Sequence, residues 1–88
     1  MKITIEKLTE AEISNRGIKS WPVWEKEVSR FPWTYDAVEQ CYILEGKVSV
    51  ETAAETVTIQ AGDFVTFPKG LDCTWDIKED IRKHYNFL

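Results

Sequence analysis

Hydrophobic residues along most of the chain recur at every second position. Val48 and Val50 alternate with polar neighbours, and Val57 and Ile59 do the same. This alternation predicts strands with one buried face, because successive side chains of a strand point to opposite faces. Residues 64–67 are almost continuously apolar, which is typical of a strand covered on both faces. The chain is therefore predicted to consist mainly of short strands.

Turn signals separate these runs. They lie at residues 45–46, 52–55, 61–63 and 68–70. Short strands punctuated at this spacing favour an all-β sandwich or barrel. Only the N-terminal part carries a helical signal: Thr9 and Glu12 have the spacing of a capping box, and Gly17 would end a short helical turn.

Residues 21–35 are rich in aromatic residues and interrupted by two prolines. Because proline cannot donate to a strand ladder, this segment is predicted to form edge strands that wrap across the sheet. No repeat, linker or change in composition divides the chain. We therefore expect one domain spanning residues 1–88, with four Trp, three Tyr and four Phe supplying much of its core.

Charge and composition exclude several classes of partner. The net charge is −4 at pH 7 and the basic residues are scattered, so no nucleic-acid footprint is present. No apolar run has the length of a membrane span, and residues 1–6 alternate like a strand rather than a signal peptide. We expect a cytoplasmic protein that binds neither nucleic acid nor membrane. Cys41 and Cys73 are then expected to be buried thiols rather than a disulfide.

Two segments resemble the sequence motifs of cupins. Residues 39–46 resemble the end of the first cupin motif, and residues 62–70 resemble the start of the second. The segments that begin at Trp21 and cover residues 41–47 and 82–86 are similar to small single-domain cupins of the ureidoglycine aminohydrolase and ethanolamine-utilisation subgroup, also called DUF861. The resemblance implies a cupin-type double-stranded β-helix, which is a jelly-roll barrel.

The same resemblance locates a metal site in which the usual histidines are missing. Metal-binding cupins place His-x-His shortly before the glutamate of the first motif and another histidine after the second motif. The first two slots hold Trp33 and Tyr35, or Pro32 and Thr34 in the other alignment, while the last slot holds Cys73. We therefore expect no metal cofactor. If a divalent metal binds weakly, its ligands would be Glu39, Cys73 and the sole histidine, His84.

Period two along the predicted strands groups six residues around one cavity. They are Trp33, Tyr35, Glu39, Cys41, Cys73 and Trp75. Such a pocket would suit a small, partly apolar ligand with one polar group. Alternatively, the rings simply fill the barrel. A buried Glu39 would stay protonated, pair with Arg82 or His84, or bond the Tyr35 hydroxyl.

Three hypotheses for function follow. The first is a protein that binds an unidentified small molecule in the barrel without a standard metal site. The second is an aminohydrolase-like or isomerase-like enzyme with Glu39 as acid or base, Cys73 as nucleophile or ligand, and His84 assisting. The third is an interaction module that forms a homodimer through the aromatic residues at 21–24, unless these residues cap the barrel end instead.

Overall fold

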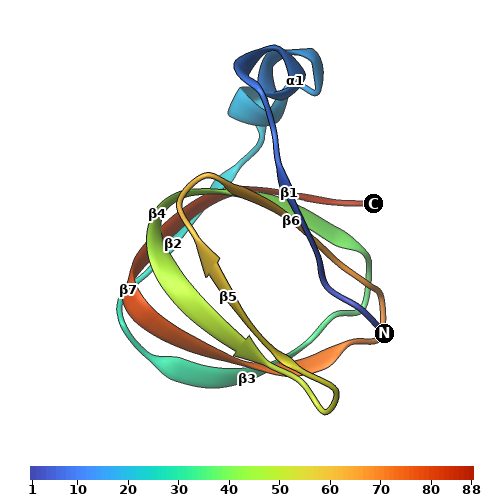
Figure 1. Ribbon diagram of the computed structural model, residues 1–88, viewed down its shortest axis with the longest axis vertical. Helices are drawn as coiled ribbons and strands as arrows, with labels where there is room; N and C mark the ends of the chain where they lie inside the picture. The colour runs from blue at the N-terminus through green and yellow to red at the C-terminus, as the bar shows by residue number, and fades with distance from the viewer.

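The computed structural model describes residues 1–88 and contains seven strands and one short α-helix (Figure 1). The elements in chain order are β1 (Thr4–Lys7), α1 (Glu10–Asn15), the 3-10 turn η1 (Ile18–Ser20), β2 (Val23–Lys26), β3 (Arg30–Thr34), β4 (Glu39–Glu51), β5 (Thr56–Gln60), β6 (Asp63–Phe67) and β7 (Asp72–Phe87). The predictions of an all-β chain and of one short N-terminal helix are both confirmed.

The strands form one antiparallel sheet that curls into a barrel. The order is β1-β6-β4-β7-β2, with β3 also on β7 and β5 also on β4. The two long strands, β4 and β7, pair along most of their length, and Figure 1 shows them on one side of the ring with α1 outside it. The early aromatic segment supplies β2 and β3, which both pair with β7 alone.

The turn predicted at residues 45–46 is wrong, because β4 continues through it. Gly46 has φ +94° and lies where the pairing with β7 shifts register. A Cβ at this position would collide with the backbone carbonyl of Asp80. Glycine therefore serves a β-bulge that bends the long strand, and does not close a hairpin.

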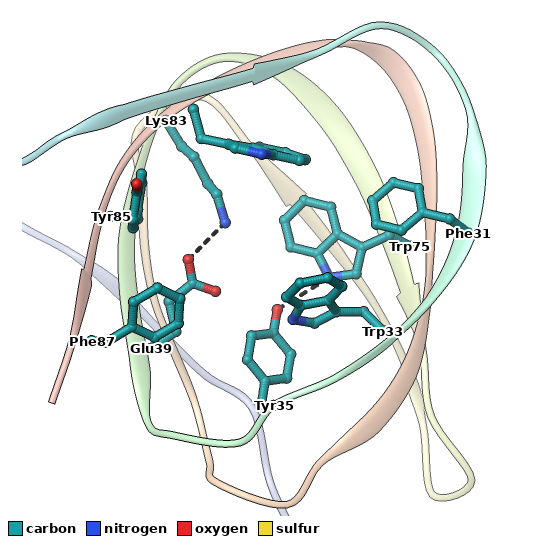
Figure 2. Close-up of a pocket in the computed structure, with 9 residues that line it drawn as sticks. Phe31, Trp33, Tyr35, Glu39, Trp75, Lys83, Tyr85 and Phe87 are labelled. Atoms are coloured by element: carbon teal, nitrogen blue, oxygen red, sulfur yellow. Dashed lines mark hydrogen bonds and ion pairs between the residues drawn. The ribbon is translucent and has the colours of Figure 1, made fainter.

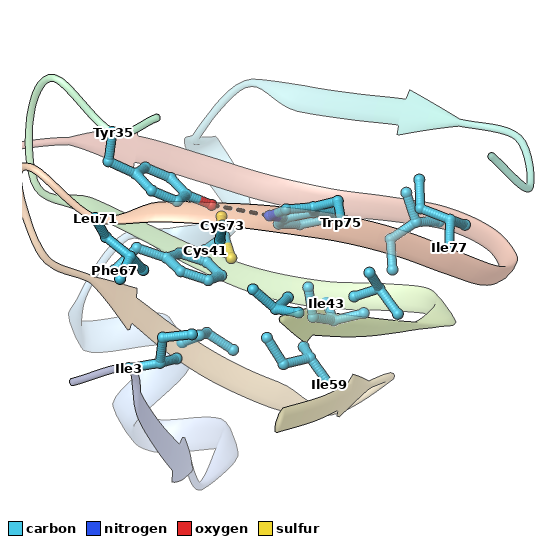
Figure 3. Close-up of a cluster of buried hydrophobic side chains, with 14 residues drawn as sticks. Ile3, Tyr35, Cys41, Ile43, Ile59, Phe67, Leu71, Cys73, Trp75 and Ile77 are labelled. Carbon is cyan, nitrogen blue, oxygen red and sulfur yellow. Dashed lines mark hydrogen bonds between the residues drawn. The ribbon is translucent and has the colours of Figure 1, made fainter. Parts of the chain in front are cut away.

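The bulge also changes which positions of β4 face inward. Before it, Glu39, Cys41 and Ile43 are buried, and after it Val48 and Val50 are buried. The buried set moves from odd to even numbers because the bulge inserts an extra residue. The strand can thus bend while both of its halves keep their apolar side chains in the barrel, where they join the core drawn in Figure 3.

The helix lies outside the barrel and is attached through a small second core. Thr9 caps α1 in a capping box with Glu12, as the sequence predicts. Ile13 and Ile18 pack against Phe64 of β6. Neither helical segment has the length and apolar character that crossing a membrane would require.

Candidate ligand-binding pocket

The barrel contains a cavity of about 220 Å³ that is partly open to solvent. Nine side chains line it, and seven of them are aromatic (Figure 2). The lining consists of Trp24, Phe31, Trp33, Tyr35, Glu39, Trp75, Lys83, Tyr85 and Phe87. Glu39 and Lys83 are its only charged members, so the cavity has apolar walls around a single pair of opposite charges.

Strand alternation explains how these residues reach one space. On β7, odd-numbered residues face the barrel interior, so Trp75 and Lys83 point inward from opposite halves of the same strand. Glu39 begins β4 opposite Phe87 and Phe67 in the strand register. Glu39 and Lys83 are therefore held on paired strands, more rigidly than on loops, while Tyr35 directly follows the end of β3.

Glu39 and Lys83 form a buried ion pair. The Lys83 ammonium Nζ donates a hydrogen bond of 2.9 Å to Glu39 Oε2, and Lys83 and Glu39 are only 5% and 4% exposed. The same Nζ lies 4.8 Å from the ring centroid of Trp75 and 5.0 Å from that of Trp24. A buried carboxylate without a partner is costly, so the ammonium offsets its charge while the two indole faces stabilise the ammonium.

Tyr35 adds a neutral polar group to the pocket. Its ring is stacked on Phe67 with centroids 4.7 Å apart, and its hydroxyl oxygen accepts a 3.2 Å hydrogen bond from Trp75 Nε1. Burial, and to a lesser extent the negative charge of Glu39, raises the pKa of the Tyr35 hydroxyl well above its usual range. Tyr35 therefore keeps its proton and can donate it in a hydrogen bond.

The two cysteines do not line the cavity, contrary to expectation. Cys41 is fully buried in the apolar core, and burial raises the pKa of its thiol to about 12. The Cys73 thiol donates to the carbonyl oxygen of Trp33 at 3.5 Å, and burial raises its pKa to about 11. Since the thiolate is the nucleophile and the metal ligand, both residues are poor candidates for either role at neutral pH.

His84 faces away from the cavity, because it is the neighbour of the inward-facing Lys83 on the same strand. Its Nδ1 lies 2.9 Å from the carbonyl oxygen of Trp21, on the outer surface of the barrel. Arg82, on the same outer face, pairs with Glu25 at 3.1 Å. Neither residue is the partner of Glu39. Glu39, Cys73 and His84, the candidate set for catalysis or for a weakly bound metal, do not come together.

The family model for the EutQ-like cupin domain matches residues 13–85. The chain belongs to this cupin family. A DUF861 family protein from Thermotoga maritima is 51% identical in sequence, and its crystal structure has a TM-score of 0.97 over 99% of this chain and 100% of that one. The cupin barrel inferred from the two sequence motifs, and the DUF861 subgroup, are therefore confirmed. A comparison with curated proteins gives no match.

More distant structures share the cupin fold. A putative ethanolamine utilization protein Q from Salmonella typhimurium is 24% identical, with a TM-score of 0.67 over 99% of this chain and 69% of that one. The EutQ protein of Clostridium difficile is 19% identical, with a TM-score of 0.69 over 97% of this chain and 66% of that one. At these identities the likeness describes the fold alone.

The residues at the metal-ligand slots of this cupin do not fit a transition metal. Trp33 and Tyr35 offer no imidazole, the Cys73 thiol is protonated, and one oxygen of Glu39 is held by Lys83. No three His, Cys, Asp or Glu side chains gather anywhere in the chain in a way that would hold a metal ion. Such sites need three or four converging ligands.

Sequence reasoning missed five of the nine residues that line the cupin cavity. These are Trp24, Phe31, Lys83, Tyr85 and Phe87. The sequence pattern could have identified three of them, Lys83, Tyr85 and Phe87. Together with Ile81 they occupy every second position and alternate with polar neighbours, and all but Lys83 are apolar. A lysine on an otherwise apolar strand face, in a chain with one expected inward glutamate, indicates a buried ion pair.

Proposed function

We propose that this cupin domain binds a small molecule in the barrel cavity, without a metal at the usual slots. The observation that carries the proposal is the Glu39–Lys83 pair, which lies almost unexposed in an aromatic cavity that nonetheless opens to solvent. A concave apolar pocket with a few convergent polar groups is the usual form of a small-molecule site.

The energetic cost of the ion pair supports a binding role. Two apolar side chains of similar size would fill the same space at equal or higher stability, because desolvating a charge pair often costs more than the pair returns. Stability alone therefore does not account for Glu39 and Lys83. Ligand recognition would account for both residues, since polar groups inside an apolar pocket orient the ligand that binds there.

The aromatic residues at the cavity mouth support the same proposal. Trp33 and Phe87 are 48% and 50% exposed, although both are large and apolar. Exposed rings that continue the wall of a cavity are well placed to cover a bound ligand, and burying them against it would contribute to affinity.

A thermal-shift screen of metabolites tests the proposal. A ligand at about 100 times its dissociation constant stabilises the folded state by about 2.7 kcal/mol, which is a Tm increase of roughly 10–20 °C for a domain of this size. Trp33→Ala should abolish most of the shift. The matched control is Val23→Ala, which truncates an exposed apolar residue whose register partner is the outward-facing His84. No shift across a broad set, or an equal shift in both variants, would overturn the proposal.

We also propose a cytoplasmic location and a homodimer. The two thiols are free and buried, which suits a reducing compartment. For the dimer, the rings of residues 21–24 offer only partial support. Trp21 packs on Phe64 at the outer face and Trp24 lines the cavity, which leaves Val23 as the exposed apolar residue. Sedimentation at several concentrations tests the dimer, and a monomer at all of them would exclude it.

A further inference from the structure

Two of the polar residues that line the cavity, Glu39 and Tyr35, leave one acceptor and one donor uncommitted. Lys83 binds Glu39 Oε2, while the second oxygen, Oε1, accepts no hydrogen bond from the protein. The Tyr35 oxygen already accepts from Trp75, so the hydroxyl hydrogen remains available. Figure 2 shows the Glu39 carboxylate and the Tyr35 hydroxyl pointing into the same space. A ligand group that donates and accepts from adjacent atoms would satisfy both.

The charge of the cavity favours a ligand without net charge. Glu39 and Lys83 are the only charged lining residues, and their contact at 2.9 Å makes their fields largely cancel beyond the pair. A charged ligand would lose its hydration on entering the aromatic walls and would find no unpaired opposite charge. A neutral ligand avoids this cost.

The walls favour a flat ring. Every apolar lining residue is aromatic and none is aliphatic. Lys83 Nζ, itself a lining atom, lies over the rings of Trp24 and Trp75, so these two indoles turn a face toward the cavity. The cavity volume of about 220 Å³ corresponds to roughly seven water molecules of liquid. That space suits one six-membered ring with one small substituent.

We propose that the pocket binds an uncharged planar ring that carries an amide at its edge. The amide N–H donates to Glu39 Oε1, the amide carbonyl accepts from the Tyr35 hydroxyl, and the ring lies between the aromatic walls. An amide is planar and neutral, and it presents a donor and an acceptor side by side, as these two residues require. The inference rests on the proposed small-molecule function and names the ligand class for the same site.

Four probes that share a benzene ring test this class on the wild-type chain. Benzamide is neutral with a donor and an acceptor, benzoate is an anion, benzamidinium is a cation, and toluene has no polar group. Benzamide should bind about tenfold or more tightly than each of the others, because only it gains both hydrogen bonds without burying a net charge.

The readout is the indole N–H signal of each tryptophan in a two-dimensional NMR titration. Trp75 Nε1 donates to Tyr35, so its signal should move and saturate when benzamide binds. Trp21 lies outside the cavity against Phe64, and its indole signal is the internal control that should stay in place.

Pocket variants should change the ligand preference in opposite directions. Glu39→Gln leaves an unpaired ammonium, so the preference should move to benzoate, while Lys83→Met leaves an unpaired carboxylate and should favour benzamidinium. If either variant fails to fold, Tyr35→Phe still tests the donor. It keeps the stack on Phe67, and it should weaken benzamide about fivefold while leaving toluene unchanged.

The outcomes separate the ligand class from the broader proposal. Benzoate or benzamidinium binding as tightly as benzamide would overturn the class, and so would a Tyr35→Phe variant with unchanged benzamide affinity. If none of the four probes moves the Trp75 signal but the metabolite screen yields a ligand, the class is wrong and the pocket function stands. If the screen is also empty, both proposals fail.

Discussion

Removing Lys83 is expected to destabilise the barrel strongly. Lys83→Met keeps an unbranched side chain, one heavy atom shorter, but leaves Glu39 buried without a partner. Breaking a buried ion pair from one side costs about 3–5 kcal/mol. A domain of this size has a total stability of about 4–13 kcal/mol, so the loss is a large share of it. At about 4–8 °C per kcal/mol, Tm should fall by roughly 12–40 °C.

A second substitution separates the charge from the packing. The thioether that Lys83→Met introduces retains favourable contacts with the rings of Trp24 and Trp75, so most of the loss should come from the unpaired carboxylate. The double variant Glu39→Leu with Lys83→Met removes both charges from an apolar cavity. Its stability should return to within about 1 kcal/mol of wild type, or exceed it. Urea denaturation followed by far-UV circular dichroism gives each value.

The matched control is an ion pair on the surface of the same barrel. Arg30 and Glu51 are joined by two short hydrogen bonds of 2.6 and 2.8 Å, but both side chains are exposed. Their double-mutant cycle should give a coupling energy below about 1 kcal/mol, against about 5 kcal/mol or more for the buried pair, because each single loss of about 3–5 kcal/mol is nearly absent from the double variant. A coupling no larger than that of the surface pair would refute the energetic role assigned to Lys83.

Three further predictions test the fold. Gly46→Ala should cost about 3 kcal/mol or more in urea denaturation, because its Cβ would collide with the Asp80 carbonyl, whereas Gly62→Ala, with φ +93° and open space, should cost only about 1–2 kcal/mol of backbone strain. Equal losses would contradict the bulge account. The Cys41 thiol has a pKa of about 12 in the folded chain and an ordinary value of 9.0, so unfolded chains lose this proton first. The Cys41 thiol should therefore lower stability by about 1.4 kcal/mol per pH unit between pH 9 and 12, in addition to the slope from Cys73, and Cys41→Ala should remove the Cys41 part. Thr9→Ala removes the cap of α1 and should cost about 1 kcal/mol; no change in Tm would exclude the cap as a stabilising contact.

The elements of the fold could be predicted because their signals are local. Period two follows from one-sided burial of a strand, and the capping box at Thr9 follows from the neighbouring residues alone. The prediction of a turn at residues 45–46 was wrong because the deciding contact is not local. A glycine with positive φ fits a hairpin turn and a bulge equally well, and only the approach of Asp80 on the partner strand decides between them.

The candidate site shows a related limit. Strand periodicity gives the face on which a side chain lies but not its depth along the barrel. Cys41 and Glu39 share a face of β4, as expected, but Glu39 lies at the cavity while Cys41 lies in the closed core. For β7 the face itself was predictable, since carrying the alternation forward from Trp75 places Lys83 inside and His84 outside.

The buried Glu39 explains why the cavity contains a lysine. Its negative charge needs a positive partner, and that partner must come from one of the other strands. The first-motif slots that would supply imidazoles hold rings without basic nitrogen, so a positive group has to come from another strand. β7 provides Lys83, and the indoles of Trp24 and Trp75 hold its ammonium in place at 5.0 and 4.8 Å. The aromatic residues therefore position the cation as well as wall the cavity. Because this ion pair is fixed in position and has no net charge, we expect the pocket to select ligands by their hydrogen-bonding groups and their shape.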